Sequence, residues 1–405
     1  MAETAPSPVA LSWEQAIERA RESSGIVRRA RAARKSVAAQ EVGASILFPA
    51  NPAVAIAAGV RQEEAAGTRL RGLSWGAHIE QTIEVGGQRS ARRERVARQV
   101  EAAKWREAVA LSEVSARVRS AYVGAQLAKA QIHAANRRTS LVEQLIASVN
   151  ARVEAGASSS VDLELARIEM GRAIRERMAA NLALSAAESD LRVVLDLEPA
   201  TPLTLTTALT EPTAWIDQNP SAGTTLAPLL VRAREQRAEL KLLAASKDAL
   251  DAEIVQLGRE AIPSPTLFLD IQRDLPGQSF LGGGIGLPFP VWRRNQGEKA
   301  IVRAETDRVL EERRLTEREI DAEVERAWRA RSAATEIAKV MATEVLPAAE
   351  AAVSLITQGW QAGKFDLFRV IQASREASDA RRSHLENLGA LWESDIALQR
   401  ALGTN

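Results

Sequence analysis

The second half of the sequence repeats the first half, and this duplication constrains the fold more than any single motif does. A shift of 206 residues superimposes equivalent positions of the two halves: Ile79 on Ile285, Val118 on Val324 and Tyr122 on Trp328. At the next turn the shift becomes 204, which aligns Asp162 with Asp366. The chain must therefore adopt an architecture that uses one supersecondary unit twice.

Each repeat predicts the same order of elements: a helix, a β-hairpin, a very long helix and a last helix. In the first repeat, residues 1–197, a capping box at Ser12–Gln15 opens the first helix. Its elements are predicted as a helix over 12–47, a hairpin over about 53–83 with a Gly-containing loop between strands 53–61 and 73–80, a long helix over about 89–154 and a helix over 161–197.

The second repeat, residues 226–405, follows the same plan. Its elements are predicted as a helix over 226–260, a hairpin over about 266–287, a long helix over about 295–358 and a helix ending near residue 402. Between the repeats, residues 198–225 hold four prolines around a short alternating segment, which is typical of a linker. The fold class is therefore mainly α with a small β part.

The long helix of the first repeat carries a continuous apolar seam. Residues 89–154 contain no proline and one glycine, so that the helix would be about 100 Å long. Apolar residues follow each other in 4-3 spacing at Val114, Val118, Ala121, Ala125, Ala128, Ile132 and Ala135. This spacing predicts coiled-coil packing through small side chains.

The strands alternate apolar with polar or small residues. Their apolar positions are candidates for facing lipid: Val54, Ile56, Trp75, Ile79, Leu267, Leu269, Ile285 and Leu287. The alternate positions include Arg61, His78, Glu80, Asp270 and Gln272. Strands of this length and pattern suit a transmembrane β-barrel, and no continuous apolar run of about 18 residues offers a spanning helix. Four strands cannot close a barrel, so closure requires an oligomer.

Composition and motifs exclude several functions. A formal net charge of +1 gives no reason to expect nucleic-acid binding, and the chain has no cysteine for disulfides or thiolate metal sites. The three histidines, His78, His133 and His384, lie far apart and have no metal-ligand spacing. No nucleophile motif, triad or phosphate loop is present either. We therefore expect no enzyme, no cofactor-binding site and no metal site.

Two segments that each join a strand to a long helix resemble a known family. IEQTIEVGGQRSARR (79–93) and IGLPFPVWRRNQGEKAIVRAE (285–305) are similar to the TolC-like outer-membrane efflux proteins, and within them to the CzcC-like heavy-metal efflux branch. The resemblance implies a trimer whose strands form one outer-membrane β-barrel, continued by a periplasmic α-helical barrel with an equatorial belt that includes residues 198–225. It also implies three partners: a periplasmic adaptor (membrane fusion) protein, an inner-membrane RND pump and outer-membrane lipid. Trp75, Phe280, Phe289 and Trp292 would then supply the aromatic girdle.

The resemblance places the turns 155–160 and 359–364 at the periplasmic tips, where a gate and an adaptor-docking surface are expected. The candidate residues are Gly156, Ser160, Asp162, Ser354, Gln358, Gly359, Gly363 and Asp366. The glycines would absorb changes of chain direction. The two aspartates, placed alike in the first turn of the following helices, could equally serve only to cap them.

The interpretation is a passive outer-membrane duct of a tripartite RND-type efflux system, gated by an adaptor at the tip and exporting heavy-metal cations. One alternative is a duct for organic compounds or drugs; another is a soluble coiled-coil scaffold whose four strands are core strands. The N-terminal MAETAPSPVALSW has no signal-peptide pattern, and Met1 directly before AETAPS suggests an initiator added to a mature secreted sequence.

Overall fold

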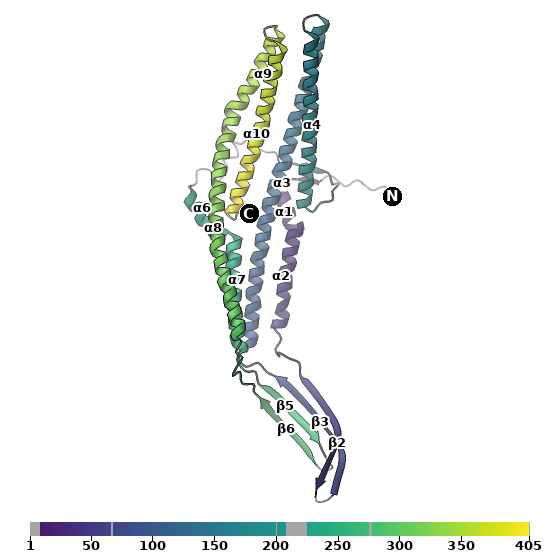
Figure 1. Cartoon of the computed structure of the whole chain (residues 1–405), viewed down its shortest axis with the longest axis vertical. Helices are drawn as coiled ribbons and strands as arrows, with labels where there is room; N and C mark the ends of the chain where they lie inside the picture. The colour runs from purple at the N-terminus through teal and green to yellow at the C-terminus, as the bar shows by residue number, and fades with distance from the viewer. Residues whose placement is uncertain (1–8, 66–67, 200, 208–224, 275–277, 405) are drawn as a thin grey trace, which may run out of the picture. The chain divides into compact units, whose positions relative to one another are not determined.

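The computed structural model describes residues 9–65, 68–199, 201–207, 225–274 and 278–404. Helices dominate, and one small sheet is formed by two hairpins far apart in the sequence (Figure 1). The predicted fold class, mainly α with a small β part, is confirmed. Most of the predicted linker, residues 208–224, lies outside the described residues, as does the N-terminal segment 1–8.

The chain forms two compact units, and each takes segments from both halves of the sequence. The first unit contains residues 1–30, 108–238 and 317–405, and the second contains residues 31–107 and 239–316. The long helix α3 (Gln88–Glu154) contributes to both units.

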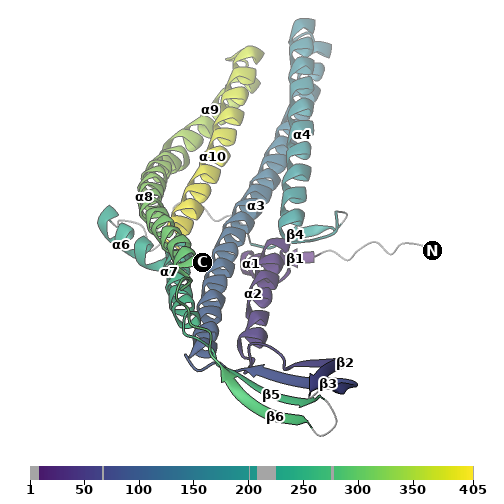
Figure 2. The same cartoon turned by 60° about the horizontal axis from the view of Figure 1, so that its bottom comes forward.

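The first unit is helical apart from two very short strands. Besides its part of α3 it contains α1 (Trp13–Ser23), α4 (Ser160–Val194), α6 (Leu226–Gln236), the C-terminal part of α8 (Gln296–Val340), the π-helical turn η1 (Met341–Val345), α9 (Leu346–Gln361) and α10 (Leu367–Ala401). Strands β1 (Val9–Leu11) and β4 (Leu203–Leu205) pair in parallel next to α1 (Figure 2). The alternating segment in the predicted linker is therefore partly a strand, and its N-terminal partner was not predicted.

The second unit combines the sheet with helices. It contains α2 (Gly25–Ala44) from Arg31 onward, α7 (Ala238–Glu260) from Glu239 onward, and the N-terminal parts of α3 and α8. Its sheet has the order β2-β3-β5-β6 and is antiparallel throughout, with strands β2 (Ala53–Ala65), β3 (Thr68–Thr82), β5 (Thr266–Arg273) and β6 (Ser279–Gly286).

The first hairpin is longer than predicted. Most of the segment expected to be a loop, between residues 61 and 73, is paired strand, with Arg61 opposite Gly72 and Gln62 opposite Arg71. Pairing satisfies the backbone groups of these polar residues as well as those of apolar ones, so polarity alone does not end a strand. The turn itself, residues 66–67, lies outside the described residues.

The helices predicted over 12–47 and 226–260 are each two helices. The breaks fall at Ser24 and Arg237, whose ψ angles of 131° and 124° are extended. Arg237 is buried, and its Nη1 donates to the Arg400 carbonyl at 3.0 Å and pairs with Glu323 at 3.0 Å. This tertiary anchoring overrides the helix propensity of the segment, which the sequence pattern could not indicate.

The long helix of the first repeat agrees with its prediction, and its seam is buried. Val114, Val118 and Ala125 are fully buried, and Ala121 is the seam position that remains half-buried. The equivalent seam on α8 is buried at Ile320, Val324, Ala327 and Ala338 and half-buried at Ala334. It also contains a buried charged residue, Arg331, whose Nε donates to buried Asp395 at 2.9 Å, so that the buried charge has a partner of opposite sign.

The long helix of the second repeat is interrupted where that of the first is regular. Residues Met341–Val345 form a π-helical turn, which is wider than an α-helical turn and holds one more residue. On its N-terminal side the two repeats align at a shift of 206, and beyond it Gly156 aligns with Gly363 at a shift of 207. The predicted change of shift to 204 was therefore wrong: one extra residue is absorbed in η1.

An 18-residue window within the helical run Gln296–Gln361 is long and apolar enough to cross a membrane, by length and composition only. None of this window is buried within the chain. No continuous apolar run marks this segment in the sequence, because two acidic residues, Glu344 and Glu350, divide its apolar residues. The window overlaps a helix whose exposed side chains include Pro347, Ala351 and Leu355.

A compact core surrounds Tyr122 in the first unit. The Tyr122 hydroxyl donates to the Leu11 carbonyl at 3.1 Å and accepts from the Thr207 amide at 3.1 Å. The Trp13 ring meets the Tyr122 ring edge to face, with 5.5 Å between centroids. One buried side chain thus fastens both short strand segments, near residues 11 and 207, to α3.

The Tyr122→Phe variant should be less stable by about 0.5 to 1.5 kcal/mol. The Thr207 amide loses its partner, whereas the Leu11 carbonyl keeps its bond from the Thr206 amide at 3.0 Å and the ring packing is retained. Thermal unfolding of the detergent-solubilised protein, followed by circular dichroism, measures this loss. Ser189→Ala is the matched control, since Ser189 is exposed and its hydroxyl bonds only a helical carbonyl of α4. Equal stability of Tyr122→Phe and the wild type would show that the Thr207 amide finds another partner.

Candidate functional site

The turn between α3 and α4 is closed by local backbone and side-chain bonds. Gly156 adopts φ +70°, a left-handed conformation that favours glycine, and the Ala157 amide donates to the Arg152 carbonyl at 2.7 Å. Ser159 caps α4, and Asp162 completes a capping box by accepting from the Ser159 amide at 3.0 Å. Ser160 is the first residue of α4. The predicted residues Gly156, Ser160 and Asp162 are thus brought together.

The turn between α9 and α10 has the same construction. Gly363 adopts φ +73°, and the Lys364 amide donates to the Gly359 carbonyl at 2.8 Å. Asp366 is the N-cap of α10, where its carboxylate accepts from the Arg369 amide at 3.0 Å. Asp366 therefore matches Ser159 and not Asp162, so the two aspartates are not placed alike.

Gly359 has a different function from that predicted. It lies inside α9 and not at the reversal of the chain. A Cβ atom at this position would stand 2.4 Å from the ring of Phe365, so the glycine permits this ring to pack against the helix. Ser354 and Gln358 lie one turn apart on an exposed side of α9, and the Gln358 amide donates to the Ser354 hydroxyl at 3.2 Å.

A contact between the two tips was missed by the sequence analysis. Arg152 Nη1 donates to the Trp360 carbonyl at 3.0 Å, and the Arg152 guanidinium lies 4.8 Å from the centroid of the Trp360 ring. Trp360 is buried against Val149 and Ile371. The arginine therefore ties the end of α3 to the end of α9 through a hydrogen bond and a cation–π contact. The available signal was an aromatic residue, Trp360, three positions before the turn glycine Gly363.

The predicted lipid-facing residues share one face of the sheet. Directly opposed residues lie on the same face, and the register places Val54 opposite Ile79 opposite Leu269, and Leu267 opposite Ile285. All of them are exposed in the single chain, from 40% for Trp75 to 77% for Ile56. Leu287 follows β6 directly and is exposed as well.

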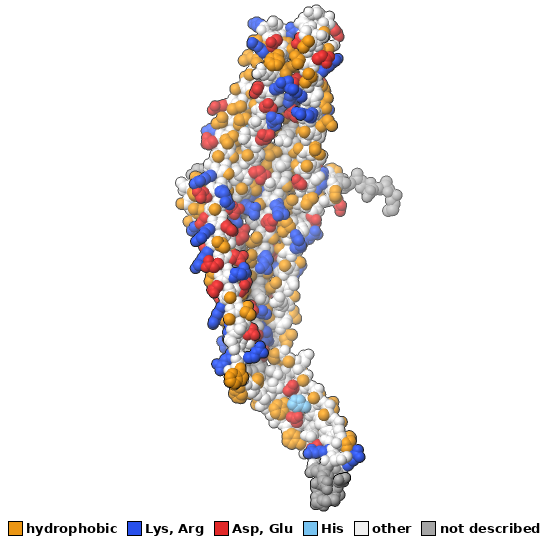
Figure 3. Space-filling view, viewed as in Figure 1, with side chains coloured by type: hydrophobic (Ala, Val, Ile, Leu, Met, Phe, Trp, Pro, Cys, Tyr) orange, Lys and Arg blue, Asp and Glu red, His pale blue; other side chains and the backbone are white. Residues whose placement is uncertain are grey.

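The opposite face of the sheet is polar. His78 Nδ1 lies 2.7 Å from Asp270 Oδ1 across β3 and β5, and Asp274 accepts from Ser74 and Arg61, both at 2.7 Å. Few charged side chains are visible on the sheet apart from those near the histidine and near its far end (Figure 3).

Two phenylalanines also lie on this polar face. The register places Phe280 opposite Gln272 and Phe268 opposite Gly284. A Cβ at Gly284 would stand 2.6 Å from the Phe268 ring, so the strand glycines make room for flat aromatic rings. The expectation that Phe280 serves in an outward aromatic girdle was wrong, because its position in the strand alternation puts it on the polar face.

No group of three or more histidine, aspartate or glutamate side chains within the described ranges could hold a metal ion. His78 belongs to the polar face of the sheet, and His384 lies in α10. The two functional regions of the chain are therefore a sheet with one apolar face and a pair of capped helical turns.

A four-stranded antiparallel sheet of this kind, joined to very long helices with capped turns, defines an outer-membrane efflux channel subunit. The sequence matches the family described as outer membrane efflux protein over residues 16–195 and 229–404. The chain belongs to this family. Its family places it in the outer membrane as an efflux channel, which rules against the soluble-scaffold alternative.

Named relatives agree with this assignment. The cobalt-zinc-cadmium resistance protein CzcC of Cupriavidus metallidurans is 27% identical over 325 residues, which cover 79% of this chain and 75% of CzcC. The crystal structure of CusC has a TM-score of 0.75 at 19% identity and covers 97% of this chain and 92% of CusC. The outer membrane channel CmeC of Campylobacter jejuni has a TM-score of 0.72 at 13% identity, covering 97% and 85%.

The Gly363→Ala variant should lose about 1 to 2 kcal/mol of stability, because alanine must adopt a left-handed conformation in the second tip turn. Gly171→Ala is the matched control, since Gly171 lies inside α4 with open space around its Cβ position and should gain about 0.5 to 1 kcal/mol. Limited proteolysis at the tip and the midpoint of thermal unfolding measure both. Similar effects of the two variants would contradict the turn geometry.

Proposed function

We propose that this protein is the passive outer-membrane duct of a tripartite RND-type efflux system and exports heavy-metal cations. The observation that carries the proposal is the sheet. One face presents exposed apolar side chains, among them Ile56, Ile79 and Leu269, and becomes polar at Gln62 and Arg71 towards the end of the first hairpin. The opposite face carries His78 and Asp270. A sheet of this kind is stable when its apolar face meets lipid and its polar face lines water. We propose no catalytic step and no cofactor for such a duct.

The open edges of the sheet support a homotrimer. In the described part of the chain β2 and β6 each pair on one side only, and an unpaired strand edge in lipid costs several kcal/mol for each backbone group. Pairing β6 of one copy with β2 of the next would close a barrel. The exposed apolar window around α9 would pack in a helical barrel that extends into the periplasm.

The capped turns support an adaptor-operated gate at the periplasmic tips. Three copies of each tip would surround one axis in a trimer, with Gly156, Ser160 and Asp162 from the first turn and residues of the second. The second-turn residues are Ser354, Gln358, Gly359, Gly363 and Asp366. Splaying the tips would break the contact between Arg152 and Trp360, and the π-helical turn η1 offers a place for α9 to bend.

The proposed partners and the proposed substrate are supported by different observations. A duct with no energy source needs an inner-membrane RND pump and a periplasmic adaptor, and its apolar face needs outer-membrane lipid. The heavy-metal assignment rests on the relative CzcC, whose name states resistance to cobalt, zinc and cadmium. The division into repeats 1–197 and 226–405, with 198–225 as an equatorial segment, is supported by the two ranges that match the family.

Deletion of the gene should make the host more sensitive to divalent metals, and the wild-type gene should restore growth. The Leu269→Arg variant should fail to do so, because arginine near the bilayer midplane costs about 2 to 4 kcal/mol for each copy. Gln272→Arg, on the polar face of the same strand, is the matched control and should restore growth. Growth inhibition and the mass of the detergent-purified complex are measured for each.

A complex of three chains is expected for the wild type and for Gln272→Arg. A stable monomer with full strand content would contradict the closed barrel. Equal activity of the two arginine variants would contradict the assignment of the faces. Sensitivity to organic compounds, with unchanged metal tolerance, would favour the alternative duct for drugs.

Crosslinking the tips should hold the gate shut. The chain has no cysteine, so Ser354→Cys introduces a single exposed thiol near the second tip. A short thiol-reactive linker should join copies around the axis and abolish the conductance that adaptor addition opens. Ser189→Cys, at an exposed position of α4, is the control for modification alone. Complete crosslinking at residue 354 with full adaptor-dependent opening would place the constriction elsewhere.

A further inference from the structure

Arginines gather in one cleft of the first unit, between α3, α4 and α10. The cleft has a volume of about 950 Å³ and is lined by five of them: Arg138, Arg172, Arg175, Arg375 and Arg382, here named the arginine cleft. Basic side chains cluster over α4 and α10 below the tips (Figure 3). Neither the gate nor the sheet uses these residues.

The cleft carries more positive than negative charge. Two acidic residues, Glu176 and Asp379, line it, and Glu169 lies beneath it. Arg382 Nε also lies 3.9 Å from Glu386, so that five guanidinium groups are set against four carboxylates. Like charges that lie close together repel one another, and a bound anion would relieve this repulsion.

The carboxylate of buried Glu169 already contacts three arginine side chains. Arg172 Nη1 donates to its Oε1 at 3.0 Å, and Arg375 Nε donates to the same oxygen at 3.1 Å. Arg138 Nη2 lies 3.7 Å from the other oxygen. The bonds from Arg375 raise the pKa of that arginine above its ordinary value. Glu169 fixes the positions of these guanidinium groups but leaves their charge in excess.

Two of the arginines have unused donors. Arg138 bonds Glu176 through Nη1, while its buried Nε has no hydrogen-bond partner. Arg175 has no ion pair or hydrogen bond with any residue that the structure describes, although Arg382, facing it from α10, pairs with Asp379 at 2.6 Å. The unused donors thus belong to side chains from α3 and α4 that line the same cleft.

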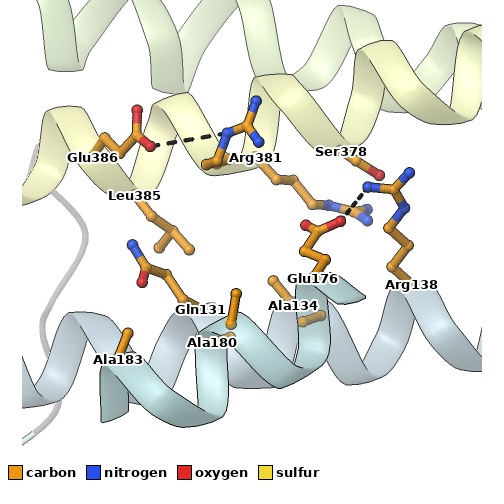
Figure 4. Close-up of a pocket in the computed structure, with 13 residues that line it drawn as sticks. Gln131, Ala134, Arg138, Glu176, Ala180, Ala183, Ser378, Arg381, Leu385 and Glu386 are labelled. Carbon is orange, nitrogen blue, oxygen red and sulfur yellow. Dashed lines mark hydrogen bonds and ion pairs between the residues drawn. The ribbon is translucent and has the colours of Figure 1, made fainter. Parts of the chain in front are cut away.

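The neighbouring pocket limits where a ligand can gain charge-assisted bonds. Figure 4 shows Ala134, Ala180 and Ala183 below Leu385 of α10 in this second pocket, which has a volume of about 340 Å³. Arg138 and Glu176 lie at the border that it shares with the arginine cleft. An anion is therefore favoured at the arginine end only.

We propose that the arginine cleft binds a small multivalent oxyanion of the phosphate class, which bridges α4 and α10. Guanidinium groups present paired donors that match phosphate oxygens, so a bound dianion offsets the excess charge and gains several charge-assisted bonds. In the proposed channel the cleft lies within about 30 Å of the tip turns along α4, counted from Ser160 to Ala179. A bridged α4–α10 pair would then favour one state of the gate, a consequence that rests on the proposed function.

The test uses the full-length protein in detergent with inorganic phosphate as the probe and sodium chloride at matched ionic strength as the reference. Phosphate should raise the thermal midpoint saturably, and calorimetry should give one site for each chain. Arg175→Gln should weaken phosphate binding on the order of tenfold, because one charge-assisted interaction is lost. The same variant should be no less stable than the wild type without phosphate, because Arg175 has no partner to lose among the described residues.

Two controls separate this site from general charge effects. Arg167 lies at an exposed position of α4 and pairs with Glu164 at 2.7 Å. The Arg167→Gln variant should bind phosphate like the wild type. Arg175→Lys, which keeps the charge, should retain part of the affinity. Equal phosphate binding by the Arg175→Gln variant and the wild type would overturn the proposal.

Two further outcomes would also overturn the proposal. In the first, chloride raises the thermal midpoint as much as phosphate does. In the second, the wild type binds no phosphate and the Arg175→Gln variant no longer forms the trimer. The second outcome would indicate that Arg175 forms an ion pair with an acidic residue of a neighbouring copy. Phosphate binding is measured on the purified protein, so its result does not depend on whether the protein exports metals.

Discussion

The rest of the structure depends on the unpaired backbone N–H and C=O groups at the two edges of the sheet. A β-strand at membrane depth must pair on both sides, because lipid offers no hydrogen bonds. One chain supplies four strands and leaves β2 and β6 each with one neighbour in the described residues. In the proposed channel, the rest of the protein must therefore be compatible with assembly around an axis. Repeated use of a hairpin and a long helix would meet this requirement, because equivalent elements would enter the proposed assembly at equivalent places.

Long stretches of the fold could be predicted because their signals are local and periodic. The 4-3 spacing on α3 gave its seam, and the two-residue alternation gave the shared face of Val54, Ile79 and Leu269. Features that depend on distant contacts could not be predicted. The helix break at Arg237 depends on the Arg400 carbonyl, and strand β1 depends on a partner almost 200 residues away. Polarity in the first hairpin concealed its length, since backbone pairing is indifferent to side-chain charge.

The tip residues show the same division. Gly156 and Gly363 were identified correctly as turn residues. The residue that ends a helix in a left-handed backbone conformation is usually glycine, so the sequence marks the position. Asp162 and Asp366 were given equal positions because both precede apolar residues at helix starts; only the backbone shows one as the third helical residue and the other as the cap. Arg152 and Trp360 escaped notice, since a contact between a guanidinium and an aromatic ring across two hairpins has no spacing in the sequence.

The π-helical turn at Met341–Val345 has a consequence for how the two repeats could diverge. Adding one residue to an α-helix rotates every later side chain by about 100° around the axis, which would turn a buried face toward solvent. A wide turn takes up the extra residue locally, so the faces on both sides of it keep their orientation: Ala338 is buried before it and Trp360 after it. The second repeat has thereby acquired a local irregularity that the first repeat lacks, without loss of packing at either end. A duplicated rod with one such turn is no longer symmetric in stiffness, and its two copies can respond differently to the same force.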